Sequence, residues 1–140
     1  MRATIQANEI SGNRSEFDVI FDLDESEIEN SDKEFFNELI HNKLADLHQK
    51  TSQYLAEVID LSKPAFEGGL ILSEVSISKL TESESLPNVR MDSHRVEVTS
   101  YFENDGDNFW KVLFTACMFS SLGQSDSLLM SPYELRREES

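Results

Sequence analysis

The side chains with the clearest chemical potential are a dense run of carboxylates near the N-terminus. Asp22, Asp24 and Ser26 stand at positions one, three and five of an EF-hand calcium loop. Position six of that loop requires glycine and position twelve requires a bidentate glutamate, but this chain has Glu27 and Lys33 there. An EF-hand is therefore excluded, which leaves only loose binding of divalent cations by clustered acids.

Other catalytic or metal-binding motifs are missing from the sequence. His41 and His48 share a helical face, but they would lie about 10 Å apart along the helix axis. With Glu38 they offer too few ligands for a zinc site, so we interpret both as solvated helix residues. There is no Gly-x-Ser-x-Gly motif, no cysteine beside a basic group and no phosphate-binding glycine loop. We expect no catalytic residue, no metal ligand, no cofactor and no enzymatic activity.

The charge balance indicates the class of partner. The 140 residues include 27 Asp and Glu against 12 Lys and Arg, which gives a formal net charge of −15. Such a surface repels nucleic acid and anionic membranes and attracts basic proteins. We therefore expect a basic protein partner, no direct binding of nucleic acid and no membrane association. The sequence says nothing about the oligomeric state.

The cellular compartment follows from three further features. No stretch approaches the length of a membrane span, and the N-terminus lacks the apolar core of a signal peptide. The single cysteine, Cys117, lies in an apolar run and is expected to be a buried, inert thiol. We expect a cytoplasmic protein.

The acidic residues begin on a predicted strand. From residue 16 to residue 24, apolar and acidic side chains alternate except at Ile20, which is typical of a strand with one buried face. We predict a β-hairpin formed by Arg2–Ile10 and Ser15–Asp24 around a Ser-Gly-Asn turn. The outward face would carry the carboxylates.

A helix is predicted to follow the acidic strand. Ser31 and Glu34 have the spacing of a capping box, and apolar residues then recur every three or four positions. Pro64 sets the far limit. Because about 30 residues of helix would span roughly 45 Å, a break at Gln49–Ser52 is plausible.

The remainder of the chain reads mainly as strands. Residues Thr81–Asn88 should form a loop, and Phe109–Leu122 could be a buried helix instead of a strand, although its Asp-Gly turn and β-forming residues favour a strand. The predicted strands are Leu70–Leu80, Arg95–Phe102, Phe109–Phe119 and a short edge strand, Leu128–Met130. We predict an α+β fold in which an antiparallel sheet of about five to six strands packs against one long, possibly broken helix. Residues 1–133 would form one domain and residues 134–140 a charged tail or frayed helix.

One aromatic side chain is a candidate anchor for a partner. Successive strand residues point to opposite faces, so Phe109 and Trp110 cannot face the same side of the sheet. One of them therefore needs a second covering layer or a partner. Our first interpretation of these aromatic residues is a core that packs the last hairpin against the helix. The second is that Trp110 or Tyr101 is an exposed anchor, since Trp and Tyr are enriched at the energetic centres of interfaces.

The acidic residues have three interpretations. They could only keep the domain soluble, dock onto a basic protein, or mimic nucleic acid. Alternate strand residues are about 6.6 Å apart, whereas duplex DNA carries one charge per ~1.7 Å of its axis. Mimicry would therefore need a second row of acids. The predicted partner-binding residues are Glu16, Asp18, Asp22, Asp24, Glu25, Glu27, Glu29 and Trp110.

The acidic strand, the capped helix and the hairpin YFENDGDNFWKVLF together resemble small acidic bacterial immunity-type proteins. The resemblance lies in architecture and composition and carries over no individual residue. It implies an α+β domain that neutralises a basic toxin such as a nuclease. The alternative is a nucleic-acid-mimicking inhibitor of a DNA- or RNA-binding complex, of the phage or mobile-element anti-defence type. A carboxylate-based metal-dependent enzyme is a third hypothesis.

Overall fold

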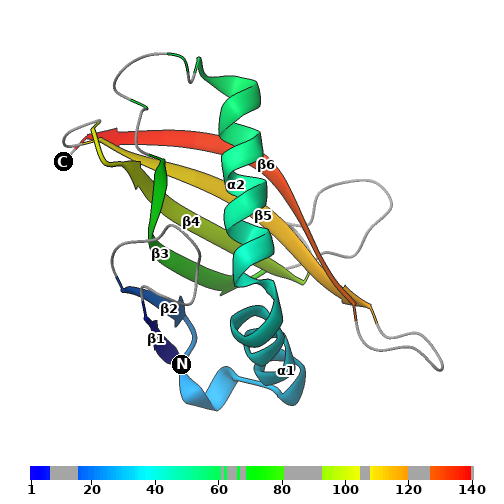
Figure 1. Ribbon diagram of the computed structural model, residues 1–140. Helices are drawn as coiled ribbons and strands as arrows, with labels where there is room; N and C mark the ends of the chain where they lie inside the picture. Colours follow the sequence, from blue (N-terminus) through cyan, green and yellow to red (C-terminus); the bar gives the residue numbers. More distant parts are fainter. Residues whose placement is uncertain are drawn as a thin grey trace.

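A six-stranded sheet with strand order β1-β2-β3-β4-β5-β6 forms one layer, and a long helix packs across one of its faces (Figure 1). The computed structural model describes residues 1–6, 16–60, 62, 66, 69–80, 93–104, 108–119 and 127–139. The strands are β1 (Arg2–Ile5), β2 (Phe17–Phe21), β3 (Leu70–Lys79), β4 (His94–Phe102), β5 (Asn108–Phe119) and β6 (Ser127–Glu139). The predicted α+β class is confirmed.

All neighbouring strands are antiparallel except β2 and β3, which run parallel. Parallel neighbours need a long crossover connection, and the helix supplies it. The predicted pairing of the first two strands is confirmed, although residues 7–15 between them lie outside the described residues. The predicted loop Thr81–Asn88 and the Asp-Gly turn lie outside them as well.

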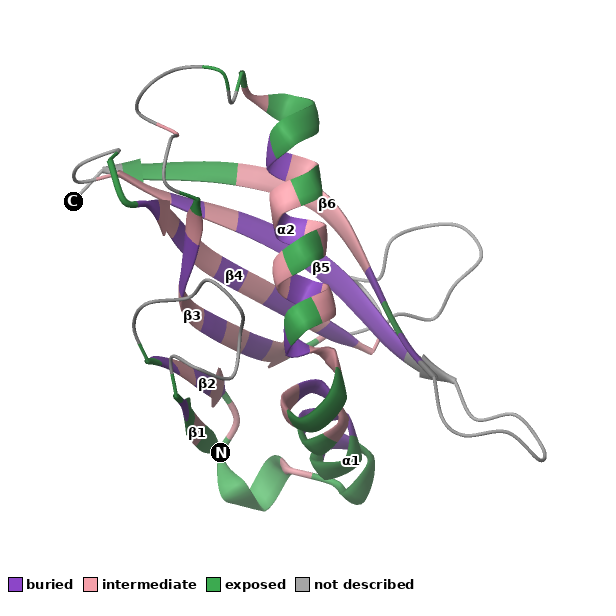
Figure 2. Ribbon diagram, viewed as in Figure 1, coloured by how far each residue is buried: buried purple, intermediate pink, exposed green. Residues whose placement is uncertain are grey.

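The core lies between the sheet and the helix. Burial alternates along β4 from His94 to Phe102, as period-two strands with one packed face require (Figure 2). The core-facing residues of β2 are Phe17, Val19 and Phe21, and each is at most 3% exposed. None of the described helices covers the other face, which we call the helix-free face (Figure 1).

The helix is one continuous run with a widened turn. It comprises α1 (Asn30–Glu38), the π-helical segment η3 (Leu39–Lys43) and α2 (Leu44–Val58), and α1 and α2 point in different directions (Figure 1). The prediction of a break at residues 49–52 is wrong. There, Thr51 donates its hydroxyl to the Leu47 carbonyl at 2.8 Å, so this polar residue stays inside a regular helix. At the π turn, Leu39 and Leu44 are five positions apart and both face the core.

The helix also begins two residues earlier than the predicted Ser31 cap. Glu29 is the N-cap, and its backbone N–H donates to the Asp32 carboxylate at 3.0 Å. The capping box is therefore present but is formed by Glu29 and Asp32 instead of Ser31 and Glu34. Glu34 is solvent-exposed. The physical reason is tertiary, because Asp32 is 1% exposed and is held by residues of β3 and β4.

The C-terminal strands are longer than predicted. The strand prediction for Phe109–Phe119 is confirmed. The predicted edge strand at Leu128–Met130 is present, but its predicted length and the predicted tail are wrong, since β6 continues from Ser127 to Glu139. It pairs with β5 along its whole length, from Phe119↔Ser127 to Asn108↔Glu139. A register shift near Pro132 accommodates a residue that cannot donate a hydrogen bond. The charges near the end are typical of an edge strand.

No helix within the described ranges has both the length and the apolarity needed to cross a membrane.

Candidate functional site

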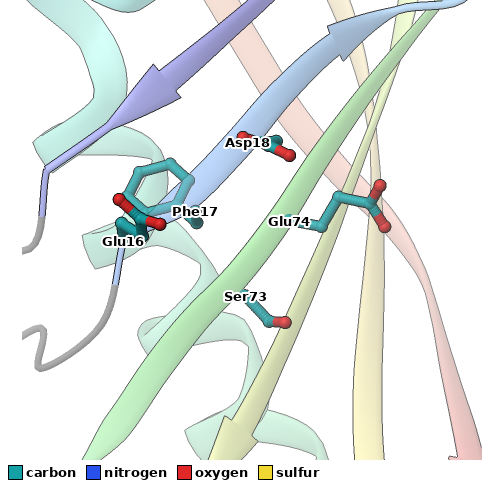
Figure 3. Close-up of a pocket in the computed structure, with 5 residues that line it drawn as sticks. All are labelled: Glu16, Phe17, Asp18, Ser73 and Glu74. Atoms are coloured by element: carbon teal, nitrogen blue, oxygen red, sulfur yellow. The ribbon is translucent and has the colours of Figure 1, made fainter.

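The predicted acidic residues fall into two groups. The first group surrounds a pocket of about 230 Å³ at the start of β2, lined by Glu16, Phe17, Asp18, Ser73 and Glu74. We call it the acidic pocket. Figure 3 shows that β2 supplies one wall and β3 the other. The parallel register places Asp18 beside Glu74, and a register shift between Leu72 and Glu74 brings in Ser73.

The three carboxylates of the acidic pocket differ in their partners. Asp18 accepts hydrogen bonds from Thr4 at 2.7 Å and from Arg2 at 2.9 Å, both on β1. The Thr4 hydrogen bond, with the charge of Arg2, lowers the pKa of Asp18. Within the described part of the chain, neither Glu16 nor Glu74 has an ion-pair partner. As far as the described residues go, the pocket therefore holds two carboxylates without a counter-charge beside one that is paired.

The second group lies on the segment from Asp22 to Glu29, which we call the acidic connection. The prediction that Asp22 and Asp24 lie on the strand is wrong, because β2 ends at Phe21. The predicted acids of this group, Asp22, Asp24, Glu25, Glu27 and Glu29, are all exposed. The 3-10 turn η2 (Glu25–Glu27) follows Asp24, and the Asp22 N–H donates to the Ile77 carbonyl at 2.9 Å. The structure thus separates these acids from Glu16 and Asp18.

Trp110 is a core residue and not an exposed anchor. It is 7% exposed and belongs to the core cluster, where its ring meets Phe66 edge-on at a centroid distance of 6.1 Å. The Arg137 guanidinium lies 5.5 Å from its ring centroid. Phe109 points to the helix-free face and contacts Tyr101 at 5.9 Å, so the prediction that Phe109 and Trp110 face opposite sides is confirmed. Tyr101 is the aromatic candidate that remains.

The sequence reasoning missed a polar cluster in which Asp32 and His94 are buried, Ser93 is half-buried and Lys79 is exposed. We call it the Asp32–His94 cluster. Asp32 Oδ1 lies 2.8 Å from His94 Nε2, and Asp32 Oδ2 accepts from Lys79 Nζ at 3.3 Å. On the other side of the ring, Ser93 Oγ lies 2.7 Å from His94 Nδ1. Nothing in the sequence links α1 to residues 79 and 93–94, because they meet only through the sheet order.

Aromatic rings enclose the imidazole of this cluster. The Phe35 ring stacks on His94 at a centroid distance of 4.0 Å, and the Phe21 ring meets it edge-on at 5.5 Å. Burial lowers the pKa of His94, although the Asp32 carboxylate opposes that shift. Burial alone would raise the pKa of Asp32, but hydrogen bonds from the Glu29 N–H, His94 and Lys79 hold it below its ordinary value.

A Ser-His-Asp chain invites comparison with nucleophilic catalysis. Such a mechanism needs an accessible hydroxyl beside a space for substrate. The acidic pocket and a pocket beside Lys50 and Tyr54 are lined by other side chains, and His94 is 4% exposed. Among described residues, no group of three or more His, Cys, Asp and Glu could hold a metal ion. We therefore assign the cluster a role in positioning α1.

The other predicted residues have mixed outcomes. His41 is exposed as predicted, but the prediction that His48 is solvated is wrong. His48 is partly buried, its Nδ1 has no hydrogen-bond partner among the residues that the structure describes, and burial lowers its pKa. Cys117 is 4% exposed, which confirms the predicted burial of its thiol.

No protein-family model, curated protein or solved structure matches this chain.

Proposed function

We propose that this protein is a non-enzymatic acidic binding domain that docks onto a basic protein. The specific form that we favour is an immunity protein that covers the active or substrate-binding surface of a basic toxin such as a nuclease. In this proposal both proteins meet in the cytoplasm. The observation that carries it is the acidic pocket, where Glu16 and Glu74 have no counter-charge among the described residues.

In this proposal charge acts at two ranges: the net charge of the protein at long range and the carboxylates of the acidic pocket at short range. The net charge of −15 would steer a basic partner and raise its association rate, an effect that falls as salt is added. Local carboxylates then act at short range. A lysine or arginine side chain entering the acidic pocket would supply the counter-charge that Glu16 and Glu74 lack among the described residues.

The acidic residues outside the pocket contribute to long-range steering more than to local pairing. Glu29 already lies 3.6 Å from Lys79 Nζ, so its charge is partly compensated. Asp22, Asp24, Glu25 and Glu27 are exposed and contribute to the long-range field. Tyr101 lies on the helix-free face, as Asp18 and Glu74 do, and could add an aromatic contact.

Nucleic-acid mimicry has less support than docking onto a protein. It requires a second row of carboxylates close to the first. On the helix-free face of β3, Glu74 is followed at alternate positions by Ser76 and Ser78. This strand therefore offers one acid where mimicry needs several.

The test begins with capture of the partner from the native host at low and high salt. The captured basic protein is then purified, and its binding to the wild type is compared with its binding to the double variant Glu16→Gln/Glu74→Gln. The matched control is Glu34→Gln/Glu57→Gln, which removes the same charge from exposed helix positions. We expect about tenfold weaker binding for the pocket variant than for the control.

Two results would overturn the proposal. One is equal affinity of the two double variants, since that would leave only the overall charge to act. The other is failure to retain any basic protein at low salt. Thermal unfolding checks that both variants are folded, and neither should differ from the wild type by more than about 0.5 kcal/mol, as is usual for surface substitutions.

A further inference from the structure

We propose that the Asp32–His94 cluster is a pH-sensitive latch that holds α1, and with it the acidic connection, on the sheet at neutral pH and loosens both on acidification. The latch itself goes beyond the proposed function. Its consequence for partner release rests on that function, because the acidic connection carries part of the steering charge.

The side chains around the His94 imidazole come from α1, β2 and β3 and from Ser93, which precedes β4. The first turn of α1 supplies Asp32, and Phe35 follows one turn later. Strand β2 supplies Phe21, and β3 supplies the Lys79 ammonium, which also lies 3.6 Å from Glu29. Beside the ring, Ser93 contacts Nδ1 and approaches the Ala116 carbonyl of β5 at 3.3 Å. Among the described residues, one buried carboxylate and one ammonium are therefore the charges that act on His94.

The hydrogen bonds define two protonation states. An ionised Asp32 only accepts, so His94 Nε2 must donate to it, and a neutral ring then accepts the Ser93 hydroxyl proton at Nδ1. In the protonated ring Nδ1 donates to Ser93 Oγ, whose proton can turn to the Ala116 carbonyl. Hydroxyl rotation therefore satisfies both states, and the difference between them is electrostatic.

Protonation of His94 places a second positive charge beside the Asp32 carboxylate, which already pairs with Lys79. His94 is 4% exposed, and its ring contacts one phenylalanine ring on its face and another edge-on, so little water can solvate the added charge. Burial and the Lys79 charge accordingly lower the pKa of His94 below its ordinary 6.5, despite Asp32. When α1 leaves the sheet, the ring returns to water and to that ordinary value.

The sign of the effect follows from proton linkage. The open state binds a proton more readily than the closed state, so acid favours opening. Above pH 6.5 the opening equilibrium of α1 should not depend on this histidine. Between 6.5 and the lower pKa of the closed state, the opening constant should approach a rise of about tenfold per pH unit, and it should then level off.

Hydrogen exchange measured by NMR tests the latch in the isolated protein, from pH 7.5 to pH 5. After correction for intrinsic exchange, the amides of α1 should lose protection below pH 6.5 by a factor that approaches about tenfold per pH unit. The amides of the central strands β4 and β5 should lose less. The imidazole resonances of His94 give its pKa in the closed state. Failure of this experiment would leave the docking proposal intact, because no partner is present.

Variants separate His94 from the other histidines. His94→Gln retains an N–H for Asp32 but does not titrate, so the pH dependence of α1 protection should disappear. The exposed control His41→Gln should keep it. Wild-type dependence in His94→Gln, or wild-type α1 protection that does not change with pH, would overturn the latch. If His94→Gln does not fold, the wild-type test decides: a His94 pKa of 6.5 or above in the closed state also overturns it.

Discussion

Asp32 on α1 and His94 on β4 lie 62 positions apart in the sequence, yet Oδ1 of the first and Nε2 of the second are 2.8 Å apart in the core. This contact joins the first turn of α1 to the start of β4. It also explains why Glu29 is the N-cap of α1, since Asp32 is the third residue of the helix and accepts from both the Glu29 N–H and His94. Four predictions follow from this contact and from others in the core and at the sheet edge.

Replacing Asp32 with alanine should destabilise the protein by about 3 kcal/mol, because the change leaves buried His94 and the Glu29 N–H without their acceptor. Urea unfolding followed by circular dichroism measures the loss. The control is Glu34→Ala, the exposed residue that the sequence pattern placed in the cap, which should change the free energy of unfolding by less than about 0.5 kcal/mol. Equal losses would contradict the observed cap.

Global stability should fall as the pH is lowered from 7 to 5. The pKa values of His94 and His48 are both lowered by burial, so their contributions are complete above 6.5 and are lost as the pH falls towards the folded-state values. Each histidine can change the free energy of unfolding by at most about 1.4 kcal/mol per pH unit. Asp32 and Asp18 also have lowered pKa values, and their contributions are lost only as the pH falls below 3.8.

Urea titrations at several pH values test this sign. His94→Gln and His48→Gln should each flatten the curve between pH 7 and pH 5, and the double variant should flatten it most. Stability that rises on acidification over this window would contradict the assignment of both rings as buried and neutral.

Truncation of Trp110 to alanine should cost about 3–5 kcal/mol, as expected for a large aromatic side chain in a packed core. Tyr101→Ala is the matched variant from the helix-free face, and its smaller loss should be measurable by the same denaturant titration. If Tyr101 contributes to docking, its truncation should weaken partner binding while the protein remains folded. A smaller stability loss for Trp110→Ala than for Tyr101→Ala would contradict the burial of the indole.

Lys50 should protect the β6 edge of the sheet. Its ammonium donates to the Met130 carbonyl at 3.1 Å and lies 3.3 Å from Asp46, while nearby Pro132 has no N–H to offer. Lys50→Ala should therefore lower stability by about 1 kcal/mol and increase self-association through the exposed edge. Analytical ultracentrifugation over a concentration series measures the association. Exposed Lys33→Ala is the control for charge, and equal association of both variants would exclude edge protection.

Local pattern determined much of the fold from the sequence alone. The alternation at Phe17, Val19 and Phe21, and again along β4, predicted strands with one buried face because side chains on a strand point alternately to its two sides. Spacings of three and four predicted the helix for the same geometric reason. The composition determined the net charge of −15 and hence the class of partner that the chain attracts.

Only the tertiary structure decided which residues meet. The parallel β2–β3 pairing places Asp18 beside Glu74, and the burial of Asp32 against β3 and β4 moves the helix start away from Ser31. Alternation predicted that Phe109 and Trp110 face opposite sides, but it could not say that the helix layer covers Trp110. A local pattern reports the orientation of a side chain within its own element, whereas burial and pairing depend on the neighbour that the sheet order supplies.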